Sequence, residues 1–123
     1  LRLAHAFFHT IGKGWIINIT DARIGGTSIP FQNYRLSKRF LADITEQMAL
    51  AFAPHIRVNA IAPGAMLPSE HSTVEEFAAM ATSIPLGRTG DIDSLVKAYA
   101  YLIENTYVTG QTLFIDGGWR LRG

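Results

Sequence analysis

Short apolar runs alternate along this chain with longer segments of helical periodicity, and that alternation limits the possible folds more than any other feature. Residues 15–20 form a short β-branched run that is almost continuously apolar. Such a run is typical of a strand covered on both faces, as in a parallel sheet. A second strand is expected at 56–62 and a third at 111–115.

Helical segments are expected at 1–11, 32–53 and 72–82, and a fourth begins at Asp91 or Asp93. Helices therefore alternate with strands, which predicts an α/β fold with a mainly parallel sheet and helices on both of its faces. Three strands leave both edges of such a sheet open, so we expect further strands or partner chains to cover them.

Two of these helices carry more specific patterns. Ser72 with Glu75 matches the capping box expected at the start of a helix. The 32–53 helix carries one apolar stripe, which we interpret as core or subunit interface: Leu36, Phe40, Ile44, Met48 and Ala51.

Composition excludes several classes of protein. The chain has 123 residues, of which 48% are hydrophobic, enough for one packed core and too many for a disordered chain. Its 11 Lys and Arg against 10 Asp and Glu give a formal net charge of +1, which does not indicate a basic surface for binding nucleic acid. It has no cysteine, which excludes disulfides and thiolate zinc sites. No apolar run reaches the ~18 residues of a membrane span and no secretory signal is visible, so we expect a cytoplasmic protein that binds neither nucleic acid nor membrane.

The residues most suggestive of chemistry are Asp21, Tyr34 and Lys38. Asp21 follows a predicted strand directly, and ligands of doubly wound sheets bind beyond the strand ends. Tyr34 and Lys38 are four residues apart and project from one helix face. A nearby ammonium favours the phenolate, so such a tyrosine could exchange a proton near neutral pH. The alternative is an ordinary surface pair on a helix.

Other polar motifs have less specific interpretations. His5 and His9 could bring two imidazoles to one metal ion, but without a third ligand nearby we expect a surface or interface pair and no metal site. The glycine pairs at 25–26 and 117–118 are expected in turns. Arg120 and Arg122 are expected in a solvated tail.

A series of motifs in a fixed order resembles the short-chain dehydrogenase/reductase family. They are IINI at 16–19, YRLSK at 34–38, RVNAIAPG at 57–64, VTGQ at 108–111 and IDGG at 115–118. The resemblance covers nearly the whole chain and implies the C-terminal half of a Rossmann-type, doubly wound parallel sheet. The glycine-rich phosphate loop of that family belongs to its N-terminal half, and no G-x-x-x-G-x-G occurs here. Residues 1–123 are therefore expected to be a single partial domain that does not bind a dinucleotide by itself.

One departure from the family pattern is informative. The family normally has a serine thirteen residues before the tyrosine, and here that position is Asp21. In this respect the chain resembles the pteridine reductase branch, including bacterial dihydromonapterin reductases, which reduce dihydropterins or dihydrofolate with NADPH. The resemblance implies that Tyr34 donates the proton and that Lys38 lowers the pKa of Tyr34 and binds the nicotinamide ribose. Asp21 would orient the pterin and assist protonation of a ring nitrogen.

The same resemblance extends to the cofactor and substrate contacts. It implies cofactor-binding roles, besides Tyr34 and Lys38, for Thr20, Pro63, Gly64 and Met66. In particular, Gly64 would let the backbone approach the nicotinamide closely. Residues 67–83 resemble a substrate loop, with Leu67 as a substrate contact. Pro68 stands where the family usually has threonine, so one pyrophosphate contact is lost or replaced.

The expected activity is therefore hydride transfer from NADPH, with NADH left open, to a dihydropterin or dihydrofolate-like small molecule. Two alternatives remain: a reductase of another carbonyl or imine, and a catalytically inactive fragment that keeps only an oligomerisation surface. The family resemblance implies a homodimer or tetramer formed through the helices at 2–11 and 32–53.

Overall fold

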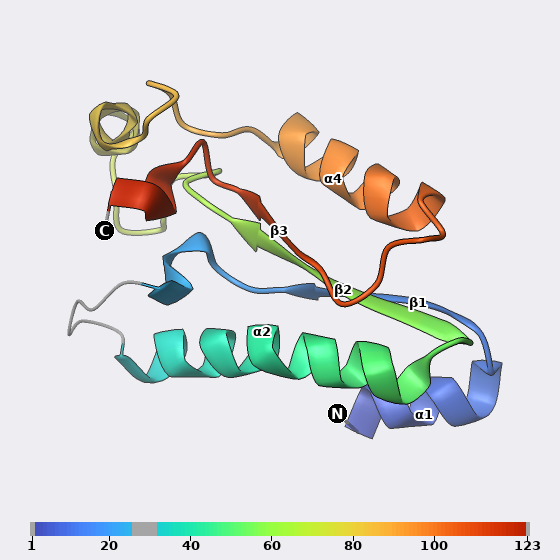
Figure 1. Ribbon diagram of the computed structural model, residues 1–123. Helices are drawn as coiled ribbons and strands as arrows, with labels where there is room; N and C mark the ends of the chain where they lie inside the picture. Colours follow the sequence, from blue (N-terminus) through green and yellow to red (C-terminus); the bar gives the residue numbers. More distant parts are fainter. Residues whose placement is uncertain (1, 26–31, 123) are drawn as a thin grey trace.

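A three-stranded parallel sheet lies between two layers of helices in the computed structural model, which describes residues 2–25 and 32–122 (Figure 1). This is the α/β architecture that the alternation predicts. The elements, with η for a short 3-10 turn, are α1 (Arg2–Ile11), β1 (Gly14–Ile19), η1 (Ala22–Gly25), α2 (Gln32–Phe52), β2 (Ile56–Pro63), α3 (Val74–Ala79), η2 (Met80–Ser83), α4 (Ile92–Glu104), β3 (Thr112–Ile115) and η3 (Trp119–Arg122).

The strands lie in the order β1-β2-β3, with Ile19 opposite Ile61 and Pro63 opposite Ile115. The central strand β2 is buried from Val58 to Ala62. Among the described residues, β1 is an edge strand and is only half-buried. Both faces of β1 are nevertheless covered by helices, as expected of residues 15–20, because Ile16 packs against the apolar cluster formed with α1 and α2 and Ile17 packs against the cluster formed with α4.

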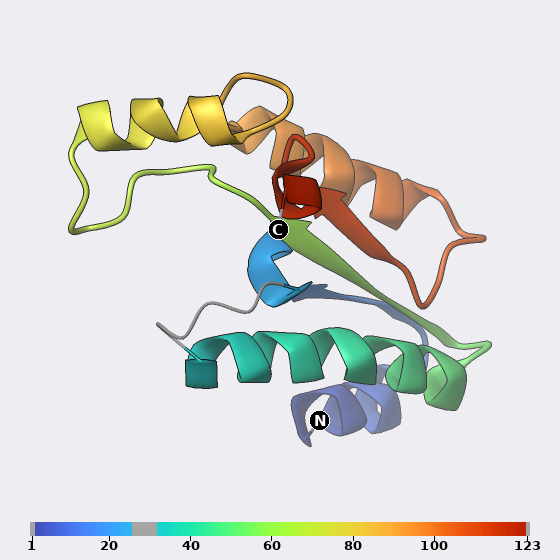
Figure 2. The ribbon, with the colours of Figure 1, turned by 60° about the vertical axis from the view of Figure 1, so that its left-hand side comes forward.

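Two apolar clusters hold the layers together. On one face of the sheet, α1 and α2 cover the beginning of β2, and α4 covers the other face (Figures 1 and 2). The first cluster consists of Ala4, Met48, Ala49, Phe52, Ile56 and Val58. The second centres on Ile61, Ala98 and Leu102. Among the described residues, no helix has both the length and the apolar character needed to cross a membrane.

The apolar stripe of α2 lies largely outside this core. Met48 is buried, but Leu36 and Phe40 are exposed, and so is Ala51. Phe40, Met48 and Ala51 instead contribute to the lining of an open groove of about 520 Å³ between α1 and α2, together with His5, Asp43, Ile44, Gln47 and Phe52. Of the two interpretations of this stripe, the core applies to Met48 and to Ile44, which packs against the same cluster.

The expected capping box is displaced by one residue. Thr73, not Ser72, is the N-cap of α3: its Oγ1 accepts a hydrogen bond from Glu76 N at 3.1 Å, and the Glu76 carboxylate accepts one from Thr73 N at 2.8 Å. The pattern occurs twice in succession, at 72/75 and 73/76. Ser72 is occupied elsewhere, because its Oγ accepts a hydrogen bond from Ser69 N at 2.9 Å.

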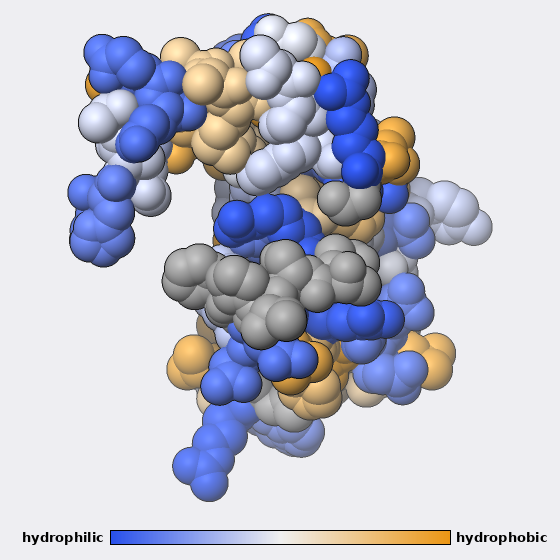
Figure 3. Space-filling model, turned by 90° about the vertical axis from the view of Figure 1, so that its left-hand side faces the viewer, coloured by the Kyte–Doolittle hydropathy of each residue, from blue (hydrophilic) through white to orange (hydrophobic). Residues whose placement is uncertain are grey.

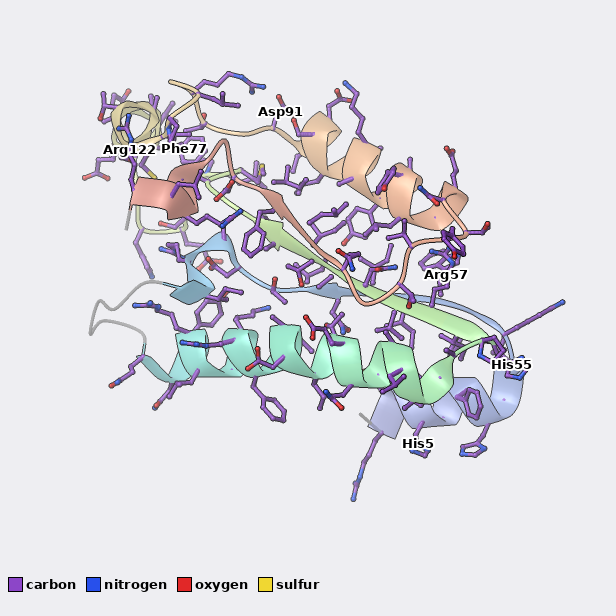
Figure 4. The ribbon with its side chains drawn as sticks, in the orientation of Figure 1. His5, His55, Arg57, Phe77, Asp91 and Arg122 are labelled. Carbon is purple, nitrogen blue, oxygen red and sulfur yellow. The ribbon has the colours of Figure 1, made fainter. Side chains whose placement is uncertain are left out.

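Two polar side chains of β2 fasten the connection between α4 and β3. Arg57 donates from Nη1 to the carbonyls of Leu102 at 2.7 Å and Val108 at 3.0 Å, at the C-terminal end of α4 (Figure 4). Buried Asn59 donates to Val108 O and accepts from Gln111 N, both at 3.0 Å. These residues of the RVN motif therefore have a structural function that needs no ligand.

The residues after β3 are not a freely solvated tail. Arg122 Nη1 donates to Thr82 O in η2 at 3.0 Å, and the Arg120 guanidinium lies 4.1 Å from the centroid of the Phe114 ring. Both arginines are exposed to solvent, as expected, but their side chains are not free of contacts. Both side chains have partners because η3 folds back beside η2 and β3.

Candidate active site

The carboxyl ends of the three strands meet at one edge of the sheet, and most of the residues predicted to carry chemistry follow these ends. Backbone hydrogen bonds fix their alignment: Thr20 N donates to Ile61 O at 2.8 Å, and Gly64 N donates to Ile115 O at 2.9 Å. In the view onto this edge, hydrophilic side chains are visible in the middle of the face (Figure 3). This is the location at which parallel α/β sheets bind ligands.

The structure brings together Asp21, Tyr34 and Lys38. The Tyr34 hydroxyl donates a hydrogen bond of 3.5 Å to Asp21 Oδ2. Lys38 Nζ lies 5.7 Å from the centroid of the Tyr34 ring and donates to Ile19 O at 2.8 Å. The side chains come from the end of β1 and the first two turns of α2, which lie side by side because α2 packs along the sheet. The group can exchange a proton between phenol and carboxylate oxygen.

The pKa of Tyr34 is raised above its ordinary value, chiefly by burial and then by the negative charge of Asp21, while the charge of Arg23 acts in the opposite direction. The sequence led us to expect that Lys38 lowers this pKa; burial and Asp21 set the direction here, and the expected effect of Lys38 remains a prediction. The Lys38 ammonium is directed to a backbone carbonyl, so its effect on the phenol does not dominate. Tyr34 is therefore protonated at neutral pH and can act as a proton donor.

Arg23 belongs to this site, although sequence reasoning did not identify it. Its backbone N and its Nε donate to Asp21 Oδ1 at 2.8 and 3.2 Å, and its Nη2 donates to Asp21 Oδ2 at 3.2 Å. Its Cζ lies 5.6 Å from the centroid of the Trp119 ring. The only available sequence signal was the Asp-x-Arg spacing, which many ordinary turns also contain.

Thr20 has a structural role in this arrangement. Its side chain is buried, and its hydroxyl donates to Ile61 O at 3.2 Å. It thereby joins the end of β1 to β2 and fixes the backbone that leads into Asp21. Its predicted contact with a cofactor remains a prediction.

Gly64 follows Pro63 at the end of β2, and the fold gives a structural reason for its lack of a side chain. Its predicted approach to the nicotinamide remains a prediction. A Cβ at this position would lie 2.8 Å from Asp116 Cα and 2.9 Å from Asp116 Cβ. The glycine is therefore required by the turn after β3. That turn is held by the Asp116 carboxylate, which accepts hydrogen bonds from Gly118 N at 2.9 Å and Arg120 N at 3.0 Å.

Met66 and Leu67 lie on the segment that follows β2 and extends away from the sheet toward α3 (Figure 2). Met66 is half-buried, and its sulfur occupies the space that a side chain at Gly90 would need. Leu67 is exposed. The segment is tied back where Gly90 N donates to Ala65 O at 2.8 Å. The predicted roles of both residues remain predictions.

The part of the chain that the structure describes contains no group of three or more residues able to hold a metal ion. The rings of His5 and His9 are 5.3 Å apart on α1, on the opposite helical layer from α4. Of the glycine pairs expected in turns, Gly117 and Gly118 both adopt positive φ, whereas Gly26 lies outside the described residues.

Comparison with known proteins gives consistent matches. Residues 2–120 match the family model described as enoyl-(acyl carrier protein) reductase. The solved structure of FolM alternative dihydrofolate reductase 1 from Brucella suis, in complex with NADP, has a TM-score of 0.88 and 35% identity over 98% of this chain. The corresponding Brucella canis protein, also complexed with NADP, has a TM-score of 0.84 and 40% identity over 89% of the chain.

Among curated proteins, a glucose 1-dehydrogenase from Gluconobacter oxydans is 38% identical over 100 residues, which is 76% of this chain. The chain spans 38% of the length of that dehydrogenase, 52% of the Brucella suis protein and 44% of the Brucella canis protein. It therefore corresponds to about half or less of each of these proteins, with which it shares part of a Rossmann-type α/β fold.

Proposed function

The chain belongs to the short-chain dehydrogenase/reductase family, and on that premise we propose that residues 1–123 form the proton-donating, C-terminal half of a longer NADPH-dependent reductase. The observation that carries this proposal is the grouping of Tyr34 Oη, Asp21 Oδ2 and Lys38 at the carboxyl edge of a parallel sheet. Three groups that can hold or transfer protons at a ligand-binding edge are suited to acid–base chemistry.

Each residue has a distinct proposed role. Tyr34 holds the proton that the substrate receives, and its raised pKa keeps that proton in place at neutral pH. Lys38 has one donor directed to Ile19 O and two further N–H groups, with which it would bind hydroxyls of the nicotinamide ribose. Asp21 accepts hydrogen bonds and would orient the substrate through its N–H groups.

The residues present fit the nicotinamide end of a dinucleotide. Tyr34 and Lys38 supply exposed or half-exposed donors at the strand ends. Pro63 ends the neighbouring strand β2, and Gly64 and Met66 follow it. The sequence has no glycine-rich loop for the phosphates, so that part of the binding site would come from outside residues 1–123. When bound, reduced nicotinamide supplies a hydride.

The proposed substrate is a dihydropterin or dihydrofolate. Reduction of its C=N bond adds a hydride to carbon and a proton to nitrogen, and Tyr34 would deliver that proton. Asp21 supports this substrate class because a carboxylate accepts hydrogen bonds from amino groups more strongly than a serine hydroxyl does. The two Brucella proteins that are described as alternative dihydrofolate reductases add support, and their NADP complexes favour NADPH as the cofactor.

A second candidate is a reductase or dehydrogenase of another carbonyl or imine. The observation that favours it is the similarity to a glucose 1-dehydrogenase at 38% identity. In this case Asp21 would replace the family serine without contacting a pterin.

The test uses the full-length protein that contains this chain. NADPH oxidation would be measured with a dihydropterin, with dihydrofolate and with a panel of ketones and aldoses. We expect turnover of the pteridines, and faster turnover of a simple ketone would favour the second candidate. Tyr34→Phe should reduce kcat by about 100-fold or more, whereas Tyr107→Phe, at a fully exposed tyrosine, should leave it unchanged.

The variant Asp21→Ser tests the proposed substrate independently of the proposed type of reaction. We expect it to abolish reduction of pteridines while the protein remains folded. If pterin reduction were intact in this variant, the substrate assignment would be wrong, even if Tyr34 were essential.

A third possibility, that residues 1–123 are a catalytically inactive piece with only an oligomerisation surface, is tested on the isolated chain. Measurable affinity of that chain for NADPH in a calorimetric titration would count against it.

We also infer that the chain associates with copies of itself through α1 and α2. The supporting observation is the apolar groove between these helices, with Phe40 and Leu36 exposed on the same side of α2. Large apolar side chains gathered on one exposed helix face are typical of a subunit interface.

A further inference from the structure

Asp21 and Arg23 form a small polar assembly at the end of β1. Asp21 is nearly enclosed, with 14% of its side chain exposed, whereas 58% of the Arg23 side chain is exposed. Both carboxylate oxygens receive a guanidinium N–H, from Nε and from Nη2. This two-point contact fixes the rotation of the carboxylate as well as its position.

The assembly extends to the C-terminal part of the chain. The guanidinium of Arg23 lies against the ring of Trp119, at 5.6 Å from its centroid. Trp119 is itself held by its backbone N, which donates to Asp116 O at 3.0 Å. An arginine that contacts an aromatic face and a carboxylate simultaneously loses much of its rotational freedom. Arg23 is therefore fixed from two sides.

The carboxylate that Arg23 holds is also the acceptor for Tyr34. Asp21 Oδ2 accepts from Arg23 Nη2 at 3.2 Å and from Tyr34 Oη at 3.5 Å. The charged groups around the phenol are thus Asp21, Arg23 and, over its ring, Lys38. Without the Arg23 side chain, Asp21 Oδ1 would still accept from Arg23 N at 2.8 Å, but Oδ2 would keep only the weak contact with Tyr34 among the described residues.

We propose that Arg23 is a positioning residue, which holds the Asp21 carboxylate in the orientation that meets both Tyr34 and the substrate, with Trp119 as its support. The inference rests on the proposed function for its catalytic consequence. Its structural content, a link from η3 through Arg23 to the acceptor of Tyr34, does not depend on the identity of the substrate.

Arg23→Lys and Arg23→Met test the two parts of this contact. Lysine keeps the charge but cannot make the two-point contact, and methionine removes both. Methionine should lower kcat for the pteridine substrate by about 10- to 100-fold, as expected of a misplaced catalytic group. Lysine should recover part of that loss. Lys97→Met, which breaks an exposed ion pair with Asp93 on α4, is the matched control and should have no effect.

The pH profile distinguishes positioning from a general loss of structure. The charge of Arg23 lowers the pKa of Tyr34, so Arg23→Met should move the alkaline limb of the kcat profile, and the spectroscopic titration of Tyr34, to higher pH. Lysine should leave that limb near its original place while kcat is reduced. A merely structural role would lower the amount of folded enzyme without moving either midpoint.

Trp119 provides an independent variant. Trp119→Phe keeps an aromatic face and should retain most of the activity, whereas Trp119→Leu should reproduce part of the Arg23→Met effect. Circular dichroism would establish that each variant is folded.

Two outcomes separate failure of this inference from failure of the proposed function. If Arg23→Met left both kcat and the titration of Tyr34 unchanged in an active enzyme, the inference would be overturned. If the wild-type protein reduced no pteridine, the proposed substrate would be wrong. The shift in the Tyr34 titration would then decide the role of Arg23 alone, with a shift supporting it and no shift refuting it.

Discussion

At the scale of single residues, the protonation of Tyr34 depends on which charged side chains the fold places beside it. Burial and the carboxylate of Asp21 both disfavour the phenolate, so they raise the pKa of this tyrosine, and Arg23 offsets part of that rise. Lys38 is close to the ring but directs its ammonium at Ile19 O. The sign of the shift therefore follows from the arrangement of several groups rather than from the Tyr-x-x-x-Lys spacing.

We predict that Asp21→Asn lowers the pKa of Tyr34. The substitution removes the negative charge that opposes ionisation, while the positive charge of Arg23 remains. The measurement is a spectrophotometric titration of tyrosinate, in which the contribution of Tyr34 among the four tyrosines is identified with Tyr34→Phe. Asp93→Asn, on α4, is the control and should not move this midpoint. An unchanged or higher midpoint in Asp21→Asn would contradict the account.

Gly64 gives a prediction about stability at the same scale. A methyl group at this position meets backbone and Cβ atoms of Asp116 that cannot move without shifting the turn after β3. Gly64→Ala should therefore lower the free energy of unfolding by about 1–3 kcal/mol. Gly90→Ala is the matched control, because its new methyl group meets mainly the flexible end of Met66 and should cost clearly less. Chemical denaturation of both variants measures the difference, and equal costs would refute the explanation.

At the scale of elements, the two aspartates at the start of α4 have different functions. Asp91 is the N-cap: its Oδ1 accepts from Ser94 N at 2.7 Å and from Ser94 Oγ at 2.6 Å. Asp93 lies within the first turn and pairs with Lys97 on the exposed surface. The sequence allowed either aspartate as the cap, and the backbone conformation at Asp91, with φ −143° and ψ 163°, determines the choice.

We therefore predict that Asp91→Ala lowers Tm more than Asp93→Ala does. The pKa of Asp91 is lowered, first by the hydrogen bond from the Ser94 hydroxyl and then by that from Ser94 N. Its contribution to stability is thus present above the ordinary carboxyl pKa and is lost as the pH falls through the lowered folded value. Thermal unfolding at several acidic pH values should show the Tm values of the wild type and of Asp91→Ala converging at low pH. A constant difference over that range would argue against the cap.

At the scale of the whole molecule, the structure of a single chain leaves one helical layer with an apolar outer face. The groove between α1 and α2 is open to solvent, and exposed Phe40 contributes to its lining. Exposed Leu36 extends the same face toward the start of α2. A face of this kind is expected to be covered in solution.

We predict that Phe40→Asp dissociates the dimer or tetramer of the full-length protein. A carboxylate in an apolar interface loses its hydration without gaining a partner. Sedimentation velocity would measure the change in mass. Val96→Asp, at an apolar residue exposed on α4, is the control and should leave the assembly intact. If both variants kept the mass of the wild type, the interface would lie elsewhere.

The sequence by itself determined the class of fold and the position of the proposed site. Apolar runs and helical periodicity are local properties, so they predict strands at 15–20, 56–62 and 111–115, close to the observed β1, β2 and β3. The site could be predicted because the end of one strand and the start of the next helix lie at the same edge of a parallel sheet. A carboxylate at the one and a tyrosine at the other must then be neighbours.

Tertiary structure decided which of these local possibilities apply. Ser72 and Thr73 offer the same capping pattern, and contacts with Ser69 and Glu76 distinguish them. The apolar periodicity of α2 is compatible with a buried helix face. Which of its residues face the sheet depends on the rotation of the packed helix about its axis.

The contacts Arg23–Trp119 and Gly64–Asp116 join residues that are far apart along the chain. No spacing rule in the sequence encodes them, because they exist only once β1, β2 and β3 are aligned and η3 has folded back across their ends. For the same physical reason, the direction in which the pKa of Tyr34 is shifted could be read only from the folded chain.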